Sequence, residues 1–346
     1  MYGNAKQRLT EARFSKSRKQ RRQMFKPTRL LCAVLSCAAL TSGNAQTTDW
    51  PTRPIRIIVP APAGGPYDRT IRPLGQHLAK TLKQPVVIEN RASAGNIVGT
   101  QAGASAAHDG YTLTMTGLQT AVSQSMYENV PYDIVTSFEH IGLIGEGFQW
   151  LVVRSDAGID NFKDFVVKVK QAPGKIDYAS SGAGSTGHLL MEQLQRAAGI
   201  KLTHVPYRGA APALQDVLSG VVPVTVIPSN AAITYVQSGK FKVLAVSSPQ
   251  RSPLVPAVPT FAELGFKELT MSSWVGLSAP KGTPPNIIQK VNAAMNTALA
   301  DPSMLKLFEF EGLTPLSRPP EQYAQLVRTD TERWGKLVHS LNIKAN

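Results

Sequence analysis

The chain has 346 residues, and its 37 Lys and Arg against 23 Asp and Glu give a net charge of +14. The first 29 residues hold ten of the basic residues and one Glu, so only +5 belongs to the remaining sequence. A body this weakly basic suits small anions better than nucleic acid, so DNA- and RNA-binding classes are excluded. The basic run at 18–22 (RKQRR) is accordingly not interpreted as a nucleic-acid arm.

An export signal is predicted at the N-terminus. The basic segment is followed by an apolar run at 30–40 (LLCAVLSCAAL) and then by the small residues Gly43 and Ala45. This order predicts a signal peptide over 1–45, cleaved near Ala45, and a periplasmic protein. The apolar run is about half as long as a membrane span requires, which argues against a permanent anchor. Met24 begins a signal of conventional length and is an alternative start.

Both cysteines, Cys32 and Cys37, lie in this signal, and lipidation of Cys37 is left open. The mature chain then has no cysteine, which excludes disulfides and thiol catalysis. The six histidines are scattered without the spacing of a zinc site, so no metal and no other cofactor is expected.

From residue 53 onward, short β-branched runs alternate with amphipathic stretches. This alternation predicts βαβ units and a mostly parallel sheet. Pro73 is expected in the first turn of its helix, where a missing N–H costs little. The first half is predicted to contain strands at 55–60, 86–90 and 111–116 and helices at 69–83 and 96–107.

The same alternation begins again after residue 148, which indicates a second α/β unit. Two further helical stretches follow at 285–299 and 320–341. The second unit is predicted to contain strands at 175–182, 202–207, 222–228 and 241–247 and helices at 187–199 and 211–220.

The stretch SSGAGSTGHLL at 180–190 contains two enzyme-like patterns. Gly182, Gly184 and Gly187 have the spacing of a dinucleotide fingerprint, but the next strand ends in HVPYRGA, without the acidic residue that would hold a ribose. Ser185 resembles the nucleophile of a hydrolase, with His188 as its base. Ala stands where the first glycine of that motif belongs, and no acid precedes a downstream histidine in the required order. A periplasmic serine hydrolase using Ser185 remains an alternative.

The leading interpretation of this stretch is an anion-binding loop without catalysis. A Gly/Ser loop that enters a helix presents free N–H groups and a partial positive charge. His188 can hold the shape of this loop. The candidate ligand-binding residues here are Ser180, Ser181, Gly184, Ser185, Thr186 and His188.

A second loop of this kind precedes the first predicted helix, at 59–70 (VPAPAGGPYDRT). Gly64 and Gly65 allow close approach of backbone N–H groups to a ligand. Asp68 is placed at or near the helix N-cap. One such loop in each unit, each at the carboxyl end of a strand, predicts a ligand cleft between two lobes.

Many ordered segments resemble the Bug family, the periplasmic solute receptors of tripartite tricarboxylate transport systems. The resemblance runs from about Trp50 to Val338. The segments that carry it include WPTRPIRIIVP, AGGPYDRTIR, PVVIENRASAGNIVG, PGKIDYASSGAGSTGHLL, AAGIKLTHVPYRGAAPALQDVLSG, RSPLVPAVPTFAELGF, WVGLSAPKGTP and TERWGKLV.

The resemblance implies a two-lobed α/β periplasmic-binding-protein fold of a type II-like kind, each lobe a mixed sheet flanked by helices. Lobe 1 would comprise 46–148 and 270–346, and lobe 2 would comprise 149–269. Crossing strands near 149–153 and 273–277 would form the hinge.

The resemblance also implies a receptor that delivers a small organic acid to membrane permease subunits. A monomer is expected, because nothing in the sequence indicates an oligomer. Tyr207 and Arg208, in VPYRG, are added to the candidate ligand-binding residues by this resemblance. A ligand-sensing subunit for a membrane kinase is the alternative role.

The class of acid is left open between di- or tricarboxylates, acidic amino acids and aromatic acids. Tyr67, Phe148 and Trp274 would favour an aromatic acid if they faced the cleft. Departures from the family pattern at Ser93, Asn96, Ser229 and Asn230 lie where ligand identity would be set.

Overall fold

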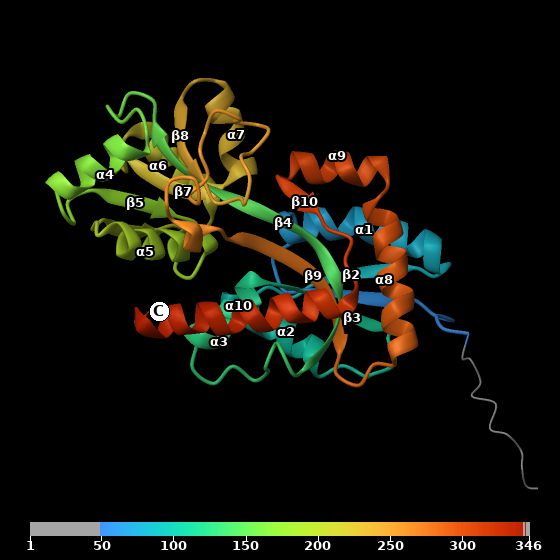
Figure 1. The fold of residues 1–346 in the computed structure, drawn as a ribbon. Coiled ribbons are helices and arrows are strands. Elements are labelled where there is room, and N and C mark those ends of the chain that lie inside the picture. Colours follow the sequence, from blue (N-terminus) through green and yellow to red (C-terminus); the bar gives the residue numbers. More distant parts are fainter. Residues whose placement is uncertain (1–48, 342, 344–346) are drawn as a thin grey trace, which may run out of the picture. The chain divides into compact units, whose positions relative to one another are not determined.

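One long strand, β4 (Phe138–Arg154), organises the sheet of this protein. The structure is a computed structural model that describes residues 49–341 and 343. The predicted signal peptide, the cleavage site near Ala45, the alternative start Met24 and Cys37 therefore lie outside the described residues. Within the described part the strands form a ten-stranded sheet, ordered β2-β1-β3-β9-β4-β7-β5-β6, with β10 and β8 also paired to β4 (Figure 1).

The first half of β4 belongs to a group of strands at one side of the sheet. Phe138–Phe148 pairs with β9 along most of its length, and β10 pairs with its end. Beyond β9 come three parallel strands, which confirms the βαβ prediction for this half. The strands of this first strand group are β1 (Ile55–Val59), β2 (Val86–Asn90), β3 (Thr112–Gly117), β9 (Ser272–Pro280) and β10 (Leu313–Pro315).

The second half of β4 belongs to the other group. Gln149–Val153 pairs with β7, and Trp150–Arg154 pairs with β8, both antiparallel. The strands of this second strand group are β5 (Asp177–Ser180), β6 (Thr203–Pro206), β7 (Val224–Pro228) and β8 (Phe241–Val246). Because β4, β8, β9 and β10 run antiparallel to their neighbours, the expectation of a mostly parallel sheet is wrong and the sheet is mixed.

Helices cover both strand groups. In the first group these are α1 (Pro66–Leu82), η1 (Ala94–Asn96), α2 (Ile97–Ala104), α3 (Leu118–Met126), α8 (Pro285–Leu299), α9 (Pro302–Phe310) and α10 (Pro320–Ser340). In the second they are α4 (Phe162–Gln171), α5 (Thr186–Ala198), α6 (Ala210–Ser219), α7 (Ser229–Gln237) and η2 (Lys267–Leu269). No helix within the described ranges is both long and apolar enough to cross a bilayer.

Helix α1 begins three residues earlier than the sequence predicts. Its N-cap is Gly65, so Pro73 lies inside the helix and not in its first turn. The missing N–H of Pro73 leaves the carbonyl of Arg69 without its usual helical partner. The sequence analysis predicts no helix where the structure has α3, α4, α7 and α9, which are each nine or ten residues long.

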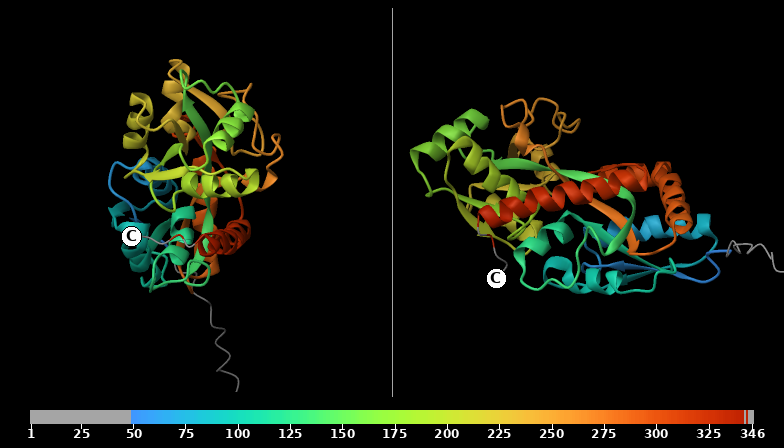
Figure 2. Two further views of the ribbon diagram at one scale, coloured as in Figure 1. Left: turned by 90° about the vertical axis from the view of Figure 1, so that its left-hand side faces the viewer. Right: turned by 60° about the horizontal axis from the view of Figure 1, so that its bottom comes forward.

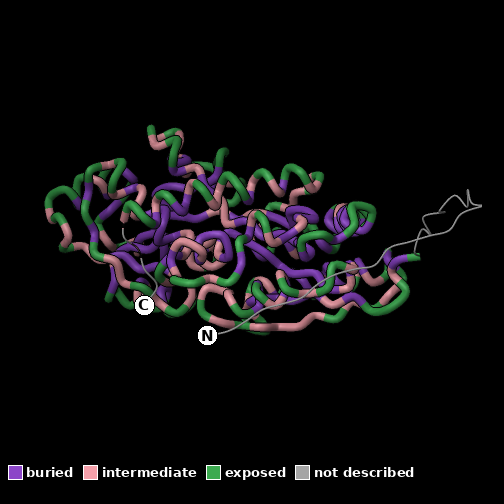
Figure 3. The backbone as a smooth tube through the Cα atoms, turned by 90° about the horizontal axis from the view of Figure 1, so that it is seen from below, coloured by how far each residue is buried: buried purple, intermediate pink, exposed green. Residues whose placement is uncertain are grey.

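Three hydrophobic clusters hold the sheet and helices together. One lies between the first strand group and helices α1 and α8, and one lies between the second group and helices α6 and α7. The largest contains residues from α3, α5 and α10 together with β4 residues of both halves, such as Leu143 and Leu151. Helix α10 therefore packs along β4 and α3, as Figures 1 and 2 show. In Figure 3 the buried stretches run through the interior and the exposed turns face outward.

Candidate functional site

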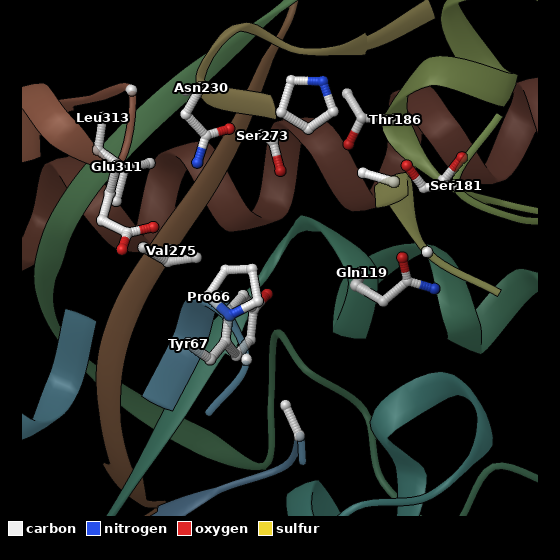
Figure 4. A pocket seen from close by; sticks show the side chains of 18 of the residues that line it. Pro66, Tyr67, Gln119, Ser181, Thr186, Asn230, Ser273, Val275, Glu311 and Leu313 are labelled. Carbon is white, nitrogen blue, oxygen red and sulfur yellow. The ribbon is translucent and has the colours of Figure 1, made fainter. Parts of the chain in front are cut away.

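A cavity of about 400 Å³ lies where loops of the two strand groups meet (Figure 4). Gly65 and Tyr67 line it from the first strand group, and Ser181 and Thr186 line it from the second. Gln149, directly after the point where β4 passes between the groups, lines it as well. The cavity is therefore bounded by residues far apart in the sequence.

The loop before α1 takes its shape from Asp68. One oxygen of this carboxylate, Oδ2, accepts a hydrogen bond from the Gly64 N–H and another from Arg72 Nε, each at 2.8 Å. The bond from Arg72 is the main cause that lowers the pKa of Asp68 to about 2. Since Asp68 is 4% exposed and does not line the cavity, it orders the loop that carries Gly65. It lies near the N-cap and is not the N-cap itself.

Several local hydrogen bonds hold the loop before α5. Ser185 is the N-cap, and its Oγ accepts from the His188 N–H at 3.3 Å. The Gly184 N–H donates to His188 Nδ1 at 3.0 Å, and the Gly182 N–H donates to Ser180 Oγ at 3.1 Å. His188 therefore fixes the shape of the loop, as the sequence suggested.

A column of rings supports this loop from behind. His188 stacks on His204 with ring centroids 4.0 Å apart, and His204 stacks on Tyr178 at 4.8 Å. Burial lowers the pKa of His188 to about 3, with a further effect of His204, and lowers the pKa of His204 to about 4. Both rings are neutral near pH 7, which lets His188 Nδ1 accept from Gly184.

The predicted site residues divide into two sets. Four of them line the cavity, namely Gly65, Ser181, Ser185 and Thr186. Seven do not line it, namely Gly64, Asp68, Ser180, Gly184, His188, Tyr207 and Arg208.

The residues behind the cavity have other contacts. Ser180 is fully buried and bonds His204 Nε2 at 2.7 Å. The Tyr207 hydroxyl donates to Asp216 at 2.5 Å, and Arg208 is exposed. Five of the seven residues that do not line the cavity shape the two loops that bound it, namely Gly64, Asp68, Ser180, Gly184 and His188.

The positions proposed to set ligand identity are partly in the cavity. Asn96 and Asn230 line it, whereas Ser229 lines a second cavity of about 430 Å³. Tyr67 lines the first cavity. Phe148 lines the second, and Trp274 is fully buried, with its indole N–H donating to Asp330 at 2.7 Å. Of the three aromatic side chains that would favour an aromatic acid if they faced the cleft, only Tyr67 lines this cavity.

Sequence reasoning missed several lining residues, including Gln119, Ser273 and Glu311. Gln119 lies in the first turn of α3, directly after the strand β3 and its final Gly117, so it repeats the signal of a strand, a glycine and a helix start. Glu311 follows α9 and has no such local signal.

The geometry does not assemble the hydrolase predicted as an alternative. The Ser185 hydroxyl accepts from a backbone N–H, and His188 Nδ1 is occupied by the Gly184 N–H. A Ser–His contact does exist between Ser180 and His204, but Ser180 is inaccessible to a substrate. Residues 49–341 and 343 hold no group of three or more His, Cys, Asp or Glu side chains arranged to bind a metal ion.

Several known proteins are similar to this chain in sequence, and others are similar in structure. The family described as "Tripartite tricarboxylate transporter family receptor" matches residues 70–343. Protein BugT of Bordetella pertussis (strain Tohama I) is 36% identical over 322 residues, which are 92% of this chain and 98% of BugT.

Two solved structures resemble this one over nearly their whole length. MatC from Rhodopseudomonas palustris, with bound malate, has a TM-score of 0.71 and 32% identity, covering 83% of this chain and 99% of MatC. Another R. palustris protein, with adipate, has a TM-score of 0.75 and 29% identity, covering 85% and 99%.

Proposed function

The chain belongs to the family of tripartite tricarboxylate transporter receptors, and we propose that it captures a small carboxylate between two lobes and delivers it to a membrane permease. The family is one of solute-binding receptors and not of enzymes. We propose lobe 1 as 46–148 and 270–346 and lobe 2 as 149–269, with closure about β4. The periplasm is the proposed location, and the neighbours with malate and adipate support an organic acid as ligand.

The observation that carries this proposal is the cavity between two helix N-termini. Thr186 and Gly187 begin α5, and Pro66 and Tyr67 begin α1, and all four line the cavity. The first N–H groups of a helix have no acceptor within the helix, and the helix dipole adds partial positive charge there. Two such ends around one cavity favour an anion, and the hydroxyls of Ser181 and Ser185 add donors.

A thermal-shift screen of the purified protein tests the proposal. Carboxylic acids are compared with the corresponding neutral amides, because a ligand that binds only the folded state raises the melting temperature with concentration. We expect one group of acids to raise it and their amides to leave it unchanged. If no acid raises it, the receptor proposal fails.

A matched pair of variants in the first loop tests the cavity itself. Gly65 lines the cavity at a φ of −74°, so Gly65→Val adds bulk without a left-handed backbone. Ala63→Val adds bulk to an exposed neighbour that does not line the cavity. We expect Gly65→Val to abolish the ligand-induced shift and Ala63→Val to retain it, with both proteins folded. Retained affinity in Gly65→Val would remove this loop from the proposed site.

A further inference from the structure

Glu311 is the one charged side chain among the described residues that line the cavity. It follows α9, the residue is 5% exposed, and its side chain lies at the opposite side of the cavity from Ser181 and Thr186 (Figure 4). The end of the cavity near α5 thus offers N–H and hydroxyl donors. The end near Glu311 presents a carboxylate.

Arg69 holds this carboxylate in place. Its Nε donates to Glu311 Oε1 at 2.6 Å, and its Nη2 donates to Oε2 at 2.9 Å. Its third nitrogen, Nη1, donates to the carbonyl of Gly64 at 2.9 Å. Arg69 does not line the cavity, and three of its five N–H groups, one on each nitrogen, have an acceptor within the protein. The guanidinium therefore compensates the charge of Glu311 from behind and is not directed at a ligand.

The free lone pairs of Glu311 decide what this end of the cavity accepts. A carboxylate oxygen can accept two hydrogen bonds, and each oxygen of Glu311 accepts one from Arg69. A hydroxyl or ammonium group on the ligand can donate to the remaining lone pairs. A second ligand carboxylate could donate nothing and would face a like charge at low exposure. Asn230 also lines the cavity and approaches Gly312. Its side-chain amide carries both a donor and an acceptor, so it does not distinguish a ligand hydroxyl or ammonium group from a second ligand carboxylate.

On the basis of the proposed receptor function, we propose that Glu311 makes this receptor select acids whose second polar group is a hydrogen-bond donor. The ligand class is a monocarboxylate with a hydroxyl or ammonium group at its far end, in preference to a dicarboxylate of the same carbon chain. The carboxylate would lie at the N-terminus of α5, and the donor would lie at Glu311.

Calorimetric titration with acids of one chain length tests this proposal. Adipate, 6-hydroxyhexanoate and 6-aminohexanoate share six carbons and differ only in the terminal group, and the four-carbon series succinate, 4-hydroxybutanoate and 4-aminobutanoate repeats the comparison. We expect the hydroxy or amino acid to bind at least about tenfold more tightly than the dicarboxylate in the series that fits. A dicarboxylate that binds as well or better would overturn the proposal and leave the receptor function intact. Failure of every acid to bind would instead contradict the receptor function.

Substitutions of Glu311 and Arg69 test whether Glu311 causes the preference for a donor-ended acid over a dicarboxylate. Glu311→Gln should lower the ratio of donor-ended to dicarboxylate affinity by about tenfold. Arg69→Gln should raise the ratio for the amino acid, because the ligand ammonium group then has the two oxygens of Glu311 without a competing guanidinium. Glu309→Gln is the control, since Glu309 is exposed on α9 and lines only the second cavity. An unchanged ratio in folded Glu311→Gln, or a lowered ratio in Arg69→Gln, would overturn the assignment.

Discussion

The imidazole rings of His188 and His204 are stacked almost parallel, with centroids 4.0 Å apart and planes 8° apart. His188 Nδ1 accepts from the Gly184 N–H, and His204 Nε2 bonds Ser180 Oγ. Both rings thus connect the loop before α5 to the interior of the second strand group. This arrangement requires neutral rings, because two stacked imidazolium ions would repel each other.

The pair predicts a loss of stability on acidification. In the unfolded chain both histidines have a pKa of about 6.5, whereas burial lowers the pKa values to about 3 and about 4 in the fold. Between these limits the unfolded state binds more protons, so the free energy of unfolding falls as the pH drops from about 6.5 towards 3. Glu192 Oε1, 3.8 Å from His188 Nε2, and the Tyr178 ring are the other titratable groups in contact with the pair.

Urea denaturation across pH 4–7 measures this effect. His204→Phe keeps a stacked ring and removes one titrating group, so its stability should fall less steeply with acid than that of the wild type. His339→Gln changes an exposed histidine on α10 and should keep the wild-type slope. Equal slopes in His204→Phe and the wild type would show that the pair is not responsible.

Gly184 should tolerate substitution less well than Gly199 at the other end of α5. Both glycines have a positive φ, +71° and +60°, so Ala costs about 1–2 kcal/mol at either position. A Cβ on Gly184 would also lie 2.1 Å from Met126 Sδ, whereas a Cβ on Gly199 meets no atom within 4 Å. Overpacking should add to the cost of Gly184→Ala towards the low end of about 1–3 kcal/mol, because Sδ is at the flexible end of the Met126 side chain and can shift.

The contact with Met126 can be isolated by a double-mutant cycle. Met126→Ala combined with Gly184→Ala should be less destabilising than the sum of the two single changes, as measured by urea denaturation. Strict additivity would mean that the loop moves away from Met126 at no cost.

Ser185 has two proposed tasks that a matched variant can separate. Ser185→Ala removes an N-cap and should cost about 1 kcal/mol of stability. Asn161→Ala removes an N-cap of the same kind on α4, where the side chain accepts from the Asp164 N–H at 3.0 Å, and Asn161 does not line the cavity.

Only Ser185→Ala should also weaken ligand binding, by about 1–2 kcal/mol for one lost hydrogen bond. The melting temperatures of the two variants without ligand compare the loss of the two N-caps. Titration of both variants with the acid found by the thermal-shift screen compares their affinities. An equal loss of affinity in both variants would mean that Ser185 acts only through the helix.

Tyr323 anchors α10 to the sheet through a buried hydroxyl chain. Its hydroxyl is 2.7 Å from Thr116 Oγ1, which is 2.7 Å from Ser278 Oγ. Tyr323→Phe should cost about 1–3 kcal/mol, because the hydroxyl group lost lies in the interior. Tyr235→Phe, at a partly exposed site on α7, should cost less, and denaturation of both variants decides the order.

Local signals were enough to predict β1, β2, α5 and the two glycine loops. A β-branched run, a Gly/Ser turn and an amphipathic helix are properties of neighbouring residues, so they can be read without knowing the fold. The loop-shaping task of His188 followed from the same short stretch, whereas the capping by Ser185 was found only in the structure. The family resemblance supplied the mixed α/β fold of a periplasmic binding protein, which the strand pairing and the solved relatives confirm, whereas the two-lobe boundaries stay a prediction.

Tertiary folding alone brings Glu311 to Arg69, from 242 residues further along the chain. No periodicity near 311 marks it, because the position depends on β10 pairing with β4 and placing the end of α9 beside the start of α1. The antiparallel role of β4 and the burial of Trp274 are likewise results of strand pairing over long separations. Sequence patterns thus located the loops that can bind an anion, whereas long-range packing selected the side chains that face it.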